Sequence, residues 1–307
     1  MSRVRRNRGS EGFAVVAVLW IVGALAALAA VYAAYLVNTT RAFAANDDRI
    51  RAEAAISAAL ALTANAVDTP KDKQAPGRGR FRFRLDRADI KVRFLSEGAR
   101  IDLNAASKEL LAGLFTALGA PADKAKEYAD NVVAWRTPPQ TGGVDKEVSL
   151  YRAAGLTYDP RQAPFASTDE LRLVRGLPQA LVSRALAYTT VFSGEAGIDV
   201  MDAPPMVLAA LPGVTPDRLT ALLRQREADP EDGKALIAML GPEQTNASAK
   251  RSKATRSLIR IAFDNGRHVA AEAVIAGGKG ETPYRVLAWR DDLDGAFAGE
   301  EAEMALR

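Results

Sequence analysis

The sequence contains no cysteine and only one histidine, His268, and these absences exclude several kinds of chemistry. Without cysteine the chain forms no disulfide, and it offers neither a thiol nucleophile nor a thiolate ligand for a metal. The sequence also lacks a phosphate-binding loop, a nucleophile elbow and a zinc-protease helix motif. Together these absences predict that the protein is not an enzyme.

Excess charge is also scarce beyond the N-terminus. The formal net charge is +4, but residues 1–12 hold four arginines and one glutamate, so three of those four charges lie there. The rest of the chain is almost neutral, whereas proteins that bind nucleic acid neutralise its phosphates with surplus positive charge. We therefore predict no nucleic-acid partner.

The N-terminal part of the chain has a long segment without any charged residue. This segment covers residues 13–37 and is 25 residues long, whereas an apolar helix needs roughly 20 residues to cross a bilayer core of about 30 Å. Arginines precede it, and positive charge is retained on the cytoplasmic side. The sequence thus predicts a single-pass protein of the inner membrane, with a cytoplasmic N-terminus and the remaining chain across the membrane.

Three interpretations of this N-terminus compete. A cleaved signal peptide could end at residues 42–44, Ala-Phe-Ala, although its apolar core would exceed the usual length of about 7–15 residues. A plain membrane anchor is the second interpretation. The third is a type IV-like prepilin leader over residues 1–12, in which Gly12 ends the leader and the apolar helix starts at the aromatic Phe13. Most prepilins carry Glu at the fifth mature position, where this chain has Ala17.

The pattern after the apolar segment predicts a long helix followed by strands. No Gly or Pro interrupts the Ala-rich chain before Pro70, so we expect one helix over residues 13–66, with residues 13–37 in the membrane and an amphipathic second half. Residues 67–103 then alternate between apolar and charged side chains, which is typical of half-buried antiparallel strands. Within them, residues 100–103 are expected to return as a strand of the same sheet.

Strand patterns reappear near the C-terminus, at residues 257–292. An Asp-Asn-Gly run at residues 264–266 there predicts a hairpin turn. Residues 104–226 are helical in pattern, residues 227–256 form a linker with a short helix, and residues 293–307 form an acidic tail. The fold class predicted is α+β, with a large all-helical domain inserted between strands of one small sheet.

The helical region contains an internal similarity. Residues 101–106 (IDLNAA) resemble residues 198–203 (IDVMDA) at an offset of 97, which predicts two related strand-to-helix units. Residues 211–219 (LPGVTPDRL) also resemble the turn of a helix-hairpin-helix, a unit that holds DNA phosphate with backbone amides. Thr215 occupies the second glycine position, and Pro216 lacks an N–H. We therefore expect helix-hairpin-helix-like units that serve packing.

A calcium site is a further hypothesis, weighed against an ordinary surface loop. The loop after residue 136 contains Asp145 and Glu147, and Asp159 lies farther on. Calcium takes about six to eight oxygen ligands, so these three carboxylates supply only part of a site.

The chain resembles the type II secretion system minor pseudopilin K (general secretion pathway protein K) family. The resemblance rests on Gly12-Phe13, on residues 18–20 (VLW), on the IDLNAA segment at residues 101–106, on residues 133–136 (VAWR) and on residues 164–176 (PFASTDELRLVRG). The family also lacks the usual Glu at the position of Ala17.

The resemblance implies a pseudopilin fold with a helical insertion and a place at the tip of a periplasmic pseudopilus. It implies cleavage between Gly12 and Phe13 by a prepilin peptidase, followed by N-methylation of Phe13. The minor pseudopilins I and J and the inner-membrane secretion platform are the implied partners. Family members can bind calcium through an acidic loop after the Trp-Arg pair, but residues 137–139 read Thr-Pro-Pro where the family is richer in Asp.

The sequence is therefore consistent with two functions. The first is a minor pseudopilin that initiates or caps assembly of the pseudopilus for protein export across the outer membrane. The alternative is a membrane-anchored helix-hairpin-helix DNA-binding protein of a DNA-uptake system.

Overall fold

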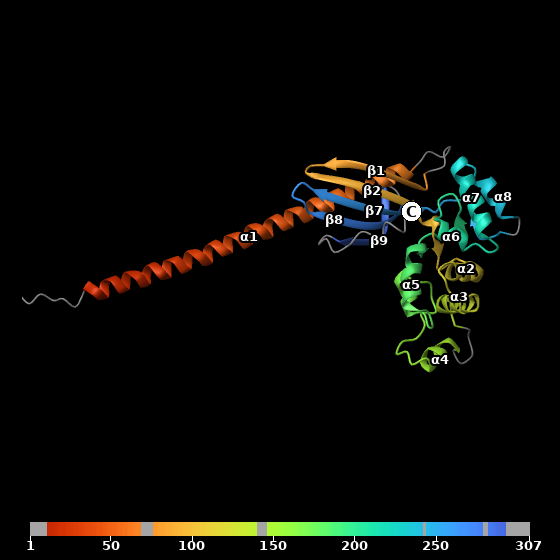
Figure 1. Ribbon diagram of the computed structural model, residues 1–307, viewed down its shortest axis with the longest axis horizontal. Helices are drawn as coiled ribbons and strands as arrows, with labels where there is room; N and C mark the ends of the chain where they lie inside the picture. Colours follow the sequence, from red (N-terminus) through yellow and green to blue (C-terminus); the bar gives the residue numbers. More distant parts are fainter. Residues whose placement is uncertain (1–10, 69–75, 140–145, 242–243, 279–281, 293–307) are drawn as a thin grey trace, which may run out of the picture. The chain divides into compact units, whose positions relative to one another are not determined.

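The computed structural model describes residues 11–68, 76–139, 146–241, 244–278 and 282–292 (Figure 1). The chain divides into two compact units, residues 1–54 and residues 55–307. A single helix, α1 (Glu11–Val67), begins in the first unit and ends in the second. Its segment Val15–Leu36 has a mean hydropathy of 2.5 and no buried residue, so its length and composition suit a membrane span.

The second unit contains a five-stranded antiparallel sheet in the order β1-β2-β7-β8-β9. Its strands are β1 (Arg78–Leu85), β2 (Ala88–Ser96), β7 (Ala254–Phe263), β8 (His268–Gly277) and β9 (Tyr284–Asp292). The central pairing joins distant parts of the chain, because Ser96 of β2 lies opposite Thr255 of β7. The expectation that both groups of strands share one sheet is therefore confirmed.

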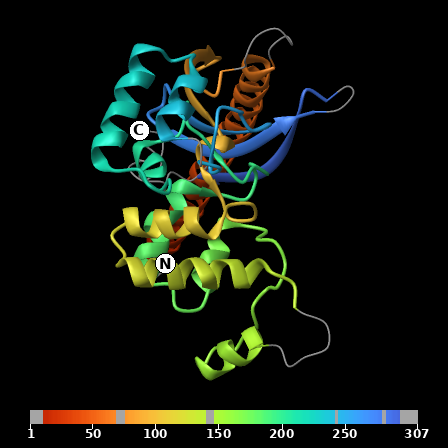
Figure 2. The ribbon, with the colours of Figure 1, turned by 90° about the vertical axis from the view of Figure 1, so that its right-hand side faces the viewer.

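One face of this sheet packs on the end of α1, which lies along it in Figures 1 and 2. Side chains that alternate along β2 and β7, such as Ile90 and Ile259, are fully buried on this face. The helix contributes small and branched residues from every turn, which lets it sit close to the strands. These buried helix residues are Ala55, Ile56, Ala59, Leu60, Thr63 and Ala64.

The predicted hairpin turn at residues 264–266 joins β7 to β8. Gly266 adopts φ 83°, a left-handed conformation that glycine reaches without steric cost. Ala262 pairs with His268 across the turn, so the sequence signal located this hairpin correctly.

All the remaining helices and short strands lie between β2 and β7 (Figure 1). They form one core of buried apolar residues that is separate from the face covered by α1. In chain order they are η1 (Glu97–Ala99), β3 (Ile101–Asp102), α2 (Lys108–Ala117), α3 (Ala122–Arg136), α4 (Lys146–Ala153), η2 (Thr168–Leu173), α5 (Gln179–Ala185), η3 (Leu186–Tyr188), β4 (Thr189–Thr190), β5 (Ile198–Asp199), α6 (Pro205–Ala209), α7 (Pro216–Ala228), α8 (Gly233–Leu240) and β6 (Ala247–Ser248).

Two sequence predictions about this region are wrong. Residues 100–103 were expected to return into the main sheet, but β3 pairs in parallel with β4 instead. The reason is the buried turn η1, which redirects the chain so that the N–H of Leu103 donates to the carbonyl of Thr190. The expected linker 227–256 also carries β6, which pairs in parallel with β5, and its last residues from Ala254 already belong to β7.

The internal similarity at an offset of 97 corresponds to a repeated architecture. In the first strand-to-helix unit, the chain runs from β3 through the helices α2 and α3, and β4 then pairs with β3. In the second, β5 leads through α6 and α7, and β6 returns to pair with β5. The prediction of two related strand-to-helix units is confirmed.

Candidate functional site

The residues predicted to be processed, Gly12 and Phe13, lie at the start of α1. Gly12 and Phe13 are within this helix, but their side chains lie outside the described part of the structure. Ala17 follows one turn later, and its neighbours on the helix are exposed large apolar residues, among them Trp20, 77% exposed. The segment Val15–Leu36 is apolar on all sides, and none of its residues is buried. It is therefore suited to contact lipid or neighbouring apolar helices.

The candidate calcium ligands do not come together among the described residues. Asp145 lies outside them, Glu147 is half-buried in the first turn of α4, and Asp159 pairs with Arg152 at 3.6 Å. No group of three or more His, Asp or Glu side chains in the described part of the chain could hold a metal. Because Asp145 lies outside the described residues, the calcium site stays a prediction.

In each of the two strand-to-helix units, an aspartate and an arginine make hydrogen bonds to the turn that follows the first strand. In the first, Asp102 Oδ1 accepts the N–H of Asn104 at 2.8 Å, and Arg136 donates to the carbonyls of Leu103 and Ala106. These contacts hold the end of α3 against the turn that follows β3. The buried carbonyls of the turn gain charged donors, which are stronger than neutral ones.

The second unit repeats this arrangement with different residues. Asp199 Oδ1 accepts the N–H of Met201 at 3.0 Å. Arg226, near the end of α7, donates to the carbonyls of Val200 at 3.4 Å and Ala203 at 2.6 Å. In both strand-to-helix units, an arginine near the end of a helix therefore holds that helix against the turn that follows a strand.

The two aspartates differ at their second oxygen. Asp102 Oδ2 accepts hydrogen bonds from Ser193 Oγ at 3.1 Å and from the N–H of Gly194 at 2.8 Å. Asp199 Oδ2 is buried and has no hydrogen-bond partner among the described residues. Burial, together with the nearby carboxylate of Asp202, raises the pKa of Asp199 to about 6.

A buried ionic cluster stands where the sheet meets the helical domain. Arg256 of β7 makes a two-pronged ion pair with Glu97 of η1, at 2.7 and 3.1 Å, and a second ion pair with Glu272 of β8. Thr190 of β4 donates its hydroxyl to the same Glu97 carboxylate. Through these residues the cluster ties β7, η1 and β4 together.

Charge in this cluster is strongly coupled. Burial alone would raise the pKa of the Glu97 carboxyl, but the guanidinium of Arg256 and its hydrogen bonds hold that pKa below its usual value. Arg100 is also buried, and burial beside Arg256 lowers its pKa to about 10. Nε of Arg100 has no hydrogen-bond partner among the described residues. The ionic cluster therefore has a structural role, and the charged states of Glu97, Arg100 and Arg256 depend on one another.

The Trp-Arg pair and the segment at residues 164–176 meet around Glu170. Trp135 Nε1 donates to Glu170 at 3.2 Å, and Arg161 pairs with the same carboxylate at 3.1 Å. Ser167 Oγ caps the 3-10 helix η2 by accepting the N–H of Asp169, whereas Glu170 accepts from Ala166. Ser167 thus begins a short 3-10 helix within the segment at residues 164–176.

Asn104, at the start of the region predicted to be helical, holds a loop. Its side-chain amide exchanges two hydrogen bonds with the backbone of Phe165, at 2.7 and 3.0 Å. The cap of α2 is Ser107, whose hydroxyl accepts the N–H of Leu110. Asn104 thus fixes the position of the 164–176 segment against the start of the domain.

The turn that resembles a helix-hairpin-helix joins α6 to α7 around Gly213, at φ 75°. A cavity of about 390 Å³ lies at this turn, and the described residues that line it include no basic side chain. A phosphate site needs such charge or a ring of free amides, and Pro216 supplies no N–H here. The turn instead packs on α2, where Gly113 approaches the carbonyl of Ala210.

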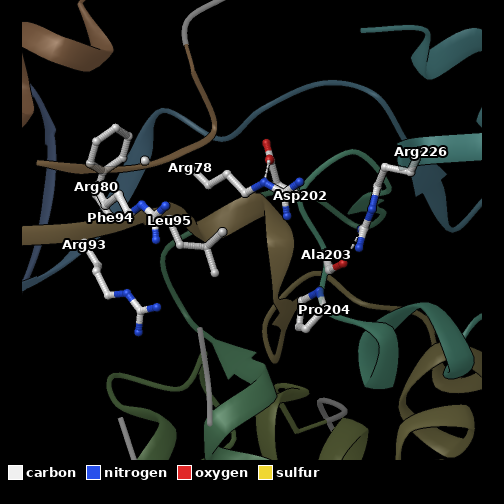
Figure 3. Close-up of a pocket in the computed structure, with 10 residues that line it drawn as sticks. Arg78, Arg80, Arg93, Phe94, Leu95, Asp202, Ala203, Pro204 and Arg226 are labelled. Atoms are coloured by element: carbon white, nitrogen blue, oxygen red, sulfur yellow. Dashed lines mark hydrogen bonds and ion pairs between the residues drawn. The ribbon is translucent and has the colours of Figure 1, made fainter. Parts of the chain in front are cut away.

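A second cavity, of about 250 Å³, lies between the first strands of the sheet and the repeated unit of β5 (Figure 3). Arg78 points toward Asp202, with 3.4 Å between Nε and Oδ1, and Arg226 points toward the backbone of Ala203. Arg80 and Arg93 also line this cavity, which makes its wall strongly basic.

Comparison with known proteins connects this arrangement to a family. Residues 90–194, from β2 to just beyond β4, match the family model described as type II secretion system (T2SS), protein K. The match shows that this part of the chain is similar to that family.

The fold is also that of a solved structure. The chain is similar to a chain of the GspK-GspI-GspJ complex from the type II secretion system of enterotoxigenic Escherichia coli, at a TM-score of 0.61 and 20% identity. The match covers 80% of this chain and 96% of that one. It shows the fold, with its antiparallel sheet and helical insertion. No curated protein matches the chain in sequence.

Sequence reasoning did not find Arg226 or the cluster around Glu97. The signal for Arg226 was present, because aligning the two units on residues 101 and 198 puts each arginine at the end of the second helix. The offset there is 90 rather than 97, since the helices of the second unit are shorter, and this difference hides the match.

Proposed function

We propose that this protein is the tip subunit of the pseudopilus, where it initiates or caps the filament during protein export across the outer membrane. The observation that carries the proposal is the apolar part of α1, which has Ala17 where most pilins have a carboxylate. A carboxylate in an apolar bilayer is costly unless a neighbouring charge pairs with it, so it favours docking beneath another subunit. A helix without it has no such requirement.

The helical domain supports the same position. It occupies residues 97–253 and more than doubles the size of the pilin-like sheet from which it emerges. A layer of subunits stacked above would have to accommodate this volume, whereas a subunit at the end of a filament meets no such layer.

The partners proposed are the minor pseudopilins I and J, because the E. coli relative was solved as a complex with GspI and GspJ. The exposed stretch of α1 around Ile50, 57% exposed, and Ala54 on the same helix face offers an apolar stripe for a neighbouring helix. Charge placed on this stripe should weaken the assembly.

Processing and orientation belong to the same proposal. Prepilin peptidase would cut between Gly12 and Phe13 on the cytoplasmic side and methylate Phe13, and the inner-membrane platform would receive the processed chain. The arginines of residues 1–12 support a cytoplasmic N-terminus and a periplasmic domain.

Site-specific cross-linking in the native host tests this function. A photoreactive residue at position 50 should capture one I-type or J-type pseudopilin per copy of this chain, and Ala54→Glu on the same helix face should abolish that product. Ala17→Glu should leave secretion intact or mildly reduced. Cross-links that place many copies along the filament shaft would defeat the proposal.

A further inference from the structure

The sheet face opposite α1 carries an unusual concentration of basic side chains. Alternate residues of β1, β2 and β7 point to this face, and eight of them are basic whereas one, Asp89, is acidic. The basic residues are Arg78, Arg80, Arg82, Arg84, Lys91, Arg93, Arg256 and Arg260. This concentration contrasts with a chain that is nearly neutral after residue 12.

Some of these side chains have their charge balanced by an acid. Arg78 pairs with Asp202, Arg84 with Asp264, and Arg256 with Glu97 and Glu272. Among the described residues, Arg80, Arg82 and Lys91 form no ion pair, and all three are exposed. We call Arg80, Arg82, Lys91, Arg93 and Arg260 the basic face.

The register sets like charges directly opposite each other. Arg80 faces Arg93 across the β1–β2 pair, and Arg82, Lys91 and Arg260 form one row across three strands. Neighbouring strands lie about 4.8 Å apart, and like charges directly opposite destabilise a sheet. Elsewhere on the same face the pairs are complementary, as in Arg84 with Asp89 and Glu272 with Arg290.

Protection of a sheet edge does not explain these rows. Charged residues on an edge strand discourage edge-to-edge aggregation, and β1 is such a strand. That role needs charge on β1 alone, but the row continues to Lys91 on β2, which is exposed and forms no ion pair among the described residues. A fold keeps such a row at a cost in stability, and the arrangement is understandable if an anionic partner neutralises it.

The structure also indicates which kind of anion fits. The exposed large apolar residues of the described strands are Leu85, Val286 and Trp289, and register places all three on the α1 face. The basic face therefore lacks the apolar and aromatic side chains that anchor proteins in lipid interfaces or stack on nucleic-acid bases. A polypeptide needs neither, because carboxylates pair with arginine forks directly.

The cavity between the sheet and the helical domain continues the basic face. Arg80 and Arg93 line it together with Arg78 and Arg226, and its volume of about 250 Å³ suits one or two acidic side chains (Figure 3). Asp202, which is nearly buried, already binds Arg78 and Arg251 there, which shows that a carboxylate is stable in this setting.

We propose that the basic face binds an extended, carboxylate-rich segment of another polypeptide, whose acidic side chains lie over the rows of like charge and enter the adjoining cavity. This goes beyond the tip position, because it assigns a partner surface to the sheet rather than to the helix. The partner is recognised by charge, so binding should weaken as salt screens the interaction.

The test uses the full-length protein in detergent and a fluorescent peptide of alternating Glu and Ala, about 12 residues long and up to roughly 40 Å when extended. Anisotropy should show binding at low ionic strength. The double variant Arg82→Glu with Lys91→Glu should weaken it about tenfold or more. The matched control, Lys126→Glu with Arg224→Glu, makes the same charge change at exposed residues of α3 and α7 and should change affinity less than about twofold.

A second measurement guards against a variant that simply misfolds. Arg82→Glu alone puts an acid opposite Lys91, so it should raise the midpoint of thermal unfolding while it weakens peptide binding. No peptide binding at low ionic strength, or equal weakening by both double variants, would overturn the proposal. Tighter binding of anionic vesicles or of DNA of equal charge would also overturn it, by assigning the face to those ligands.

Discussion

Arg136 and Arg226 make equivalent contacts in the two units of the helical domain. Each donates to the carbonyls of the residues one and four positions after the strand aspartate, which are Leu103 and Ala106 for Arg136. For Arg226 they are Val200 and Ala203. The helical domain therefore contains the same arginine–carbonyl contacts in both of its strand-to-helix units.

The first prediction concerns the loss of these arginine–carbonyl contacts. Arg226→Ala leaves two carbonyls of a buried turn without their donor, so the free energy of unfolding should fall by about 2 kcal/mol. Arg136→Ala should have a similar effect. Denaturant titration of the full chain checks both, with Arg224→Ala, an exposed position on the same helix, as the control. Equal loss in the control would show that the contacts with the turn contribute nothing.

The second prediction concerns pH and Asp199. Its pKa in the fold, about 6, lies above the ordinary 3.8, so the folded state binds the proton more tightly than the unfolded state. The stability this group contributes is full below about pH 4 and is lost as the pH rises through 6. Asp199→Asn should therefore stabilise the protein at pH 7.5, by up to ~3 kcal/mol, and change little at pH 4.

Asp102→Asn is the control for that experiment. Asp102 Oδ2 accepts from Ser193 and Gly194, and an amide NH₂ in its place would face donors. This variant should be less stable at both pH values. Stabilisation by both substitutions would contradict our interpretation of the unpartnered oxygen.

The third prediction concerns the ionic cluster. The pKa of Glu97 is lowered in the fold, so its contribution to stability is present above its unfolded pKa and is lost as the pH falls through the folded value. Glu97→Gln leaves Arg256 and Arg100 with too little negative charge in a buried site, and should cost about 3–5 kcal/mol. Glu272→Gln, at a partly exposed residue, should cost clearly less in the same thermal unfolding measurement.

The fourth prediction uses the close approach of α2 to the α6–α7 turn. A Cβ at Gly113 would lie 1.9 Å from the carbonyl oxygen of Ala210, so backbone must move to admit it. Gly113→Ala should destabilise the protein by about 1–3 kcal/mol, although alanine is otherwise the better helix former. Gly277→Ala has open space around it and should be neutral. Stabilisation by Gly113→Ala would mean that the two helices are not held together.

The fifth prediction concerns processing. Gly12→Leu should leave the precursor uncut in the native host, and mass spectrometry of the wild-type protein should find a methylated Phe13 at its N-terminus. Gly9→Leu, within the leader, should not prevent cleavage. A mature protein that starts at Ala45 would instead identify an ordinary signal peptidase.

Local patterns predicted much of this fold. Period-two alternation located β1 and β2, the Asp-Asn-Gly run located the β7–β8 hairpin, and the unbroken Ala-rich pattern predicted one helix close to the observed Glu11–Val67. These signals succeed because neighbouring residues determine them.

Features that depend on distant residues escaped the sequence. Residues 100–103 have the composition of a strand, and only the hydrogen bond from Leu103 to Thr190 decides that they leave the main sheet. The ion pair of Glu97 with Arg256 joins residues 159 positions apart, and nothing local marks either of them. The basic face was hidden in the same way, since a near-neutral total conceals how register gathers the charges.

The pairing of Ser96 with Thr255 also has a consequence for the order of folding. The hairpin of β1 and β2 is made early in synthesis, but its next neighbour β7 follows only after the whole helical domain. Contacts of such separation form slowly unless the intervening chain is already compact. The helical domain should therefore fold first and bring its two ends together, and the sheet should close last. Until then β2 of the hairpin keeps an open edge.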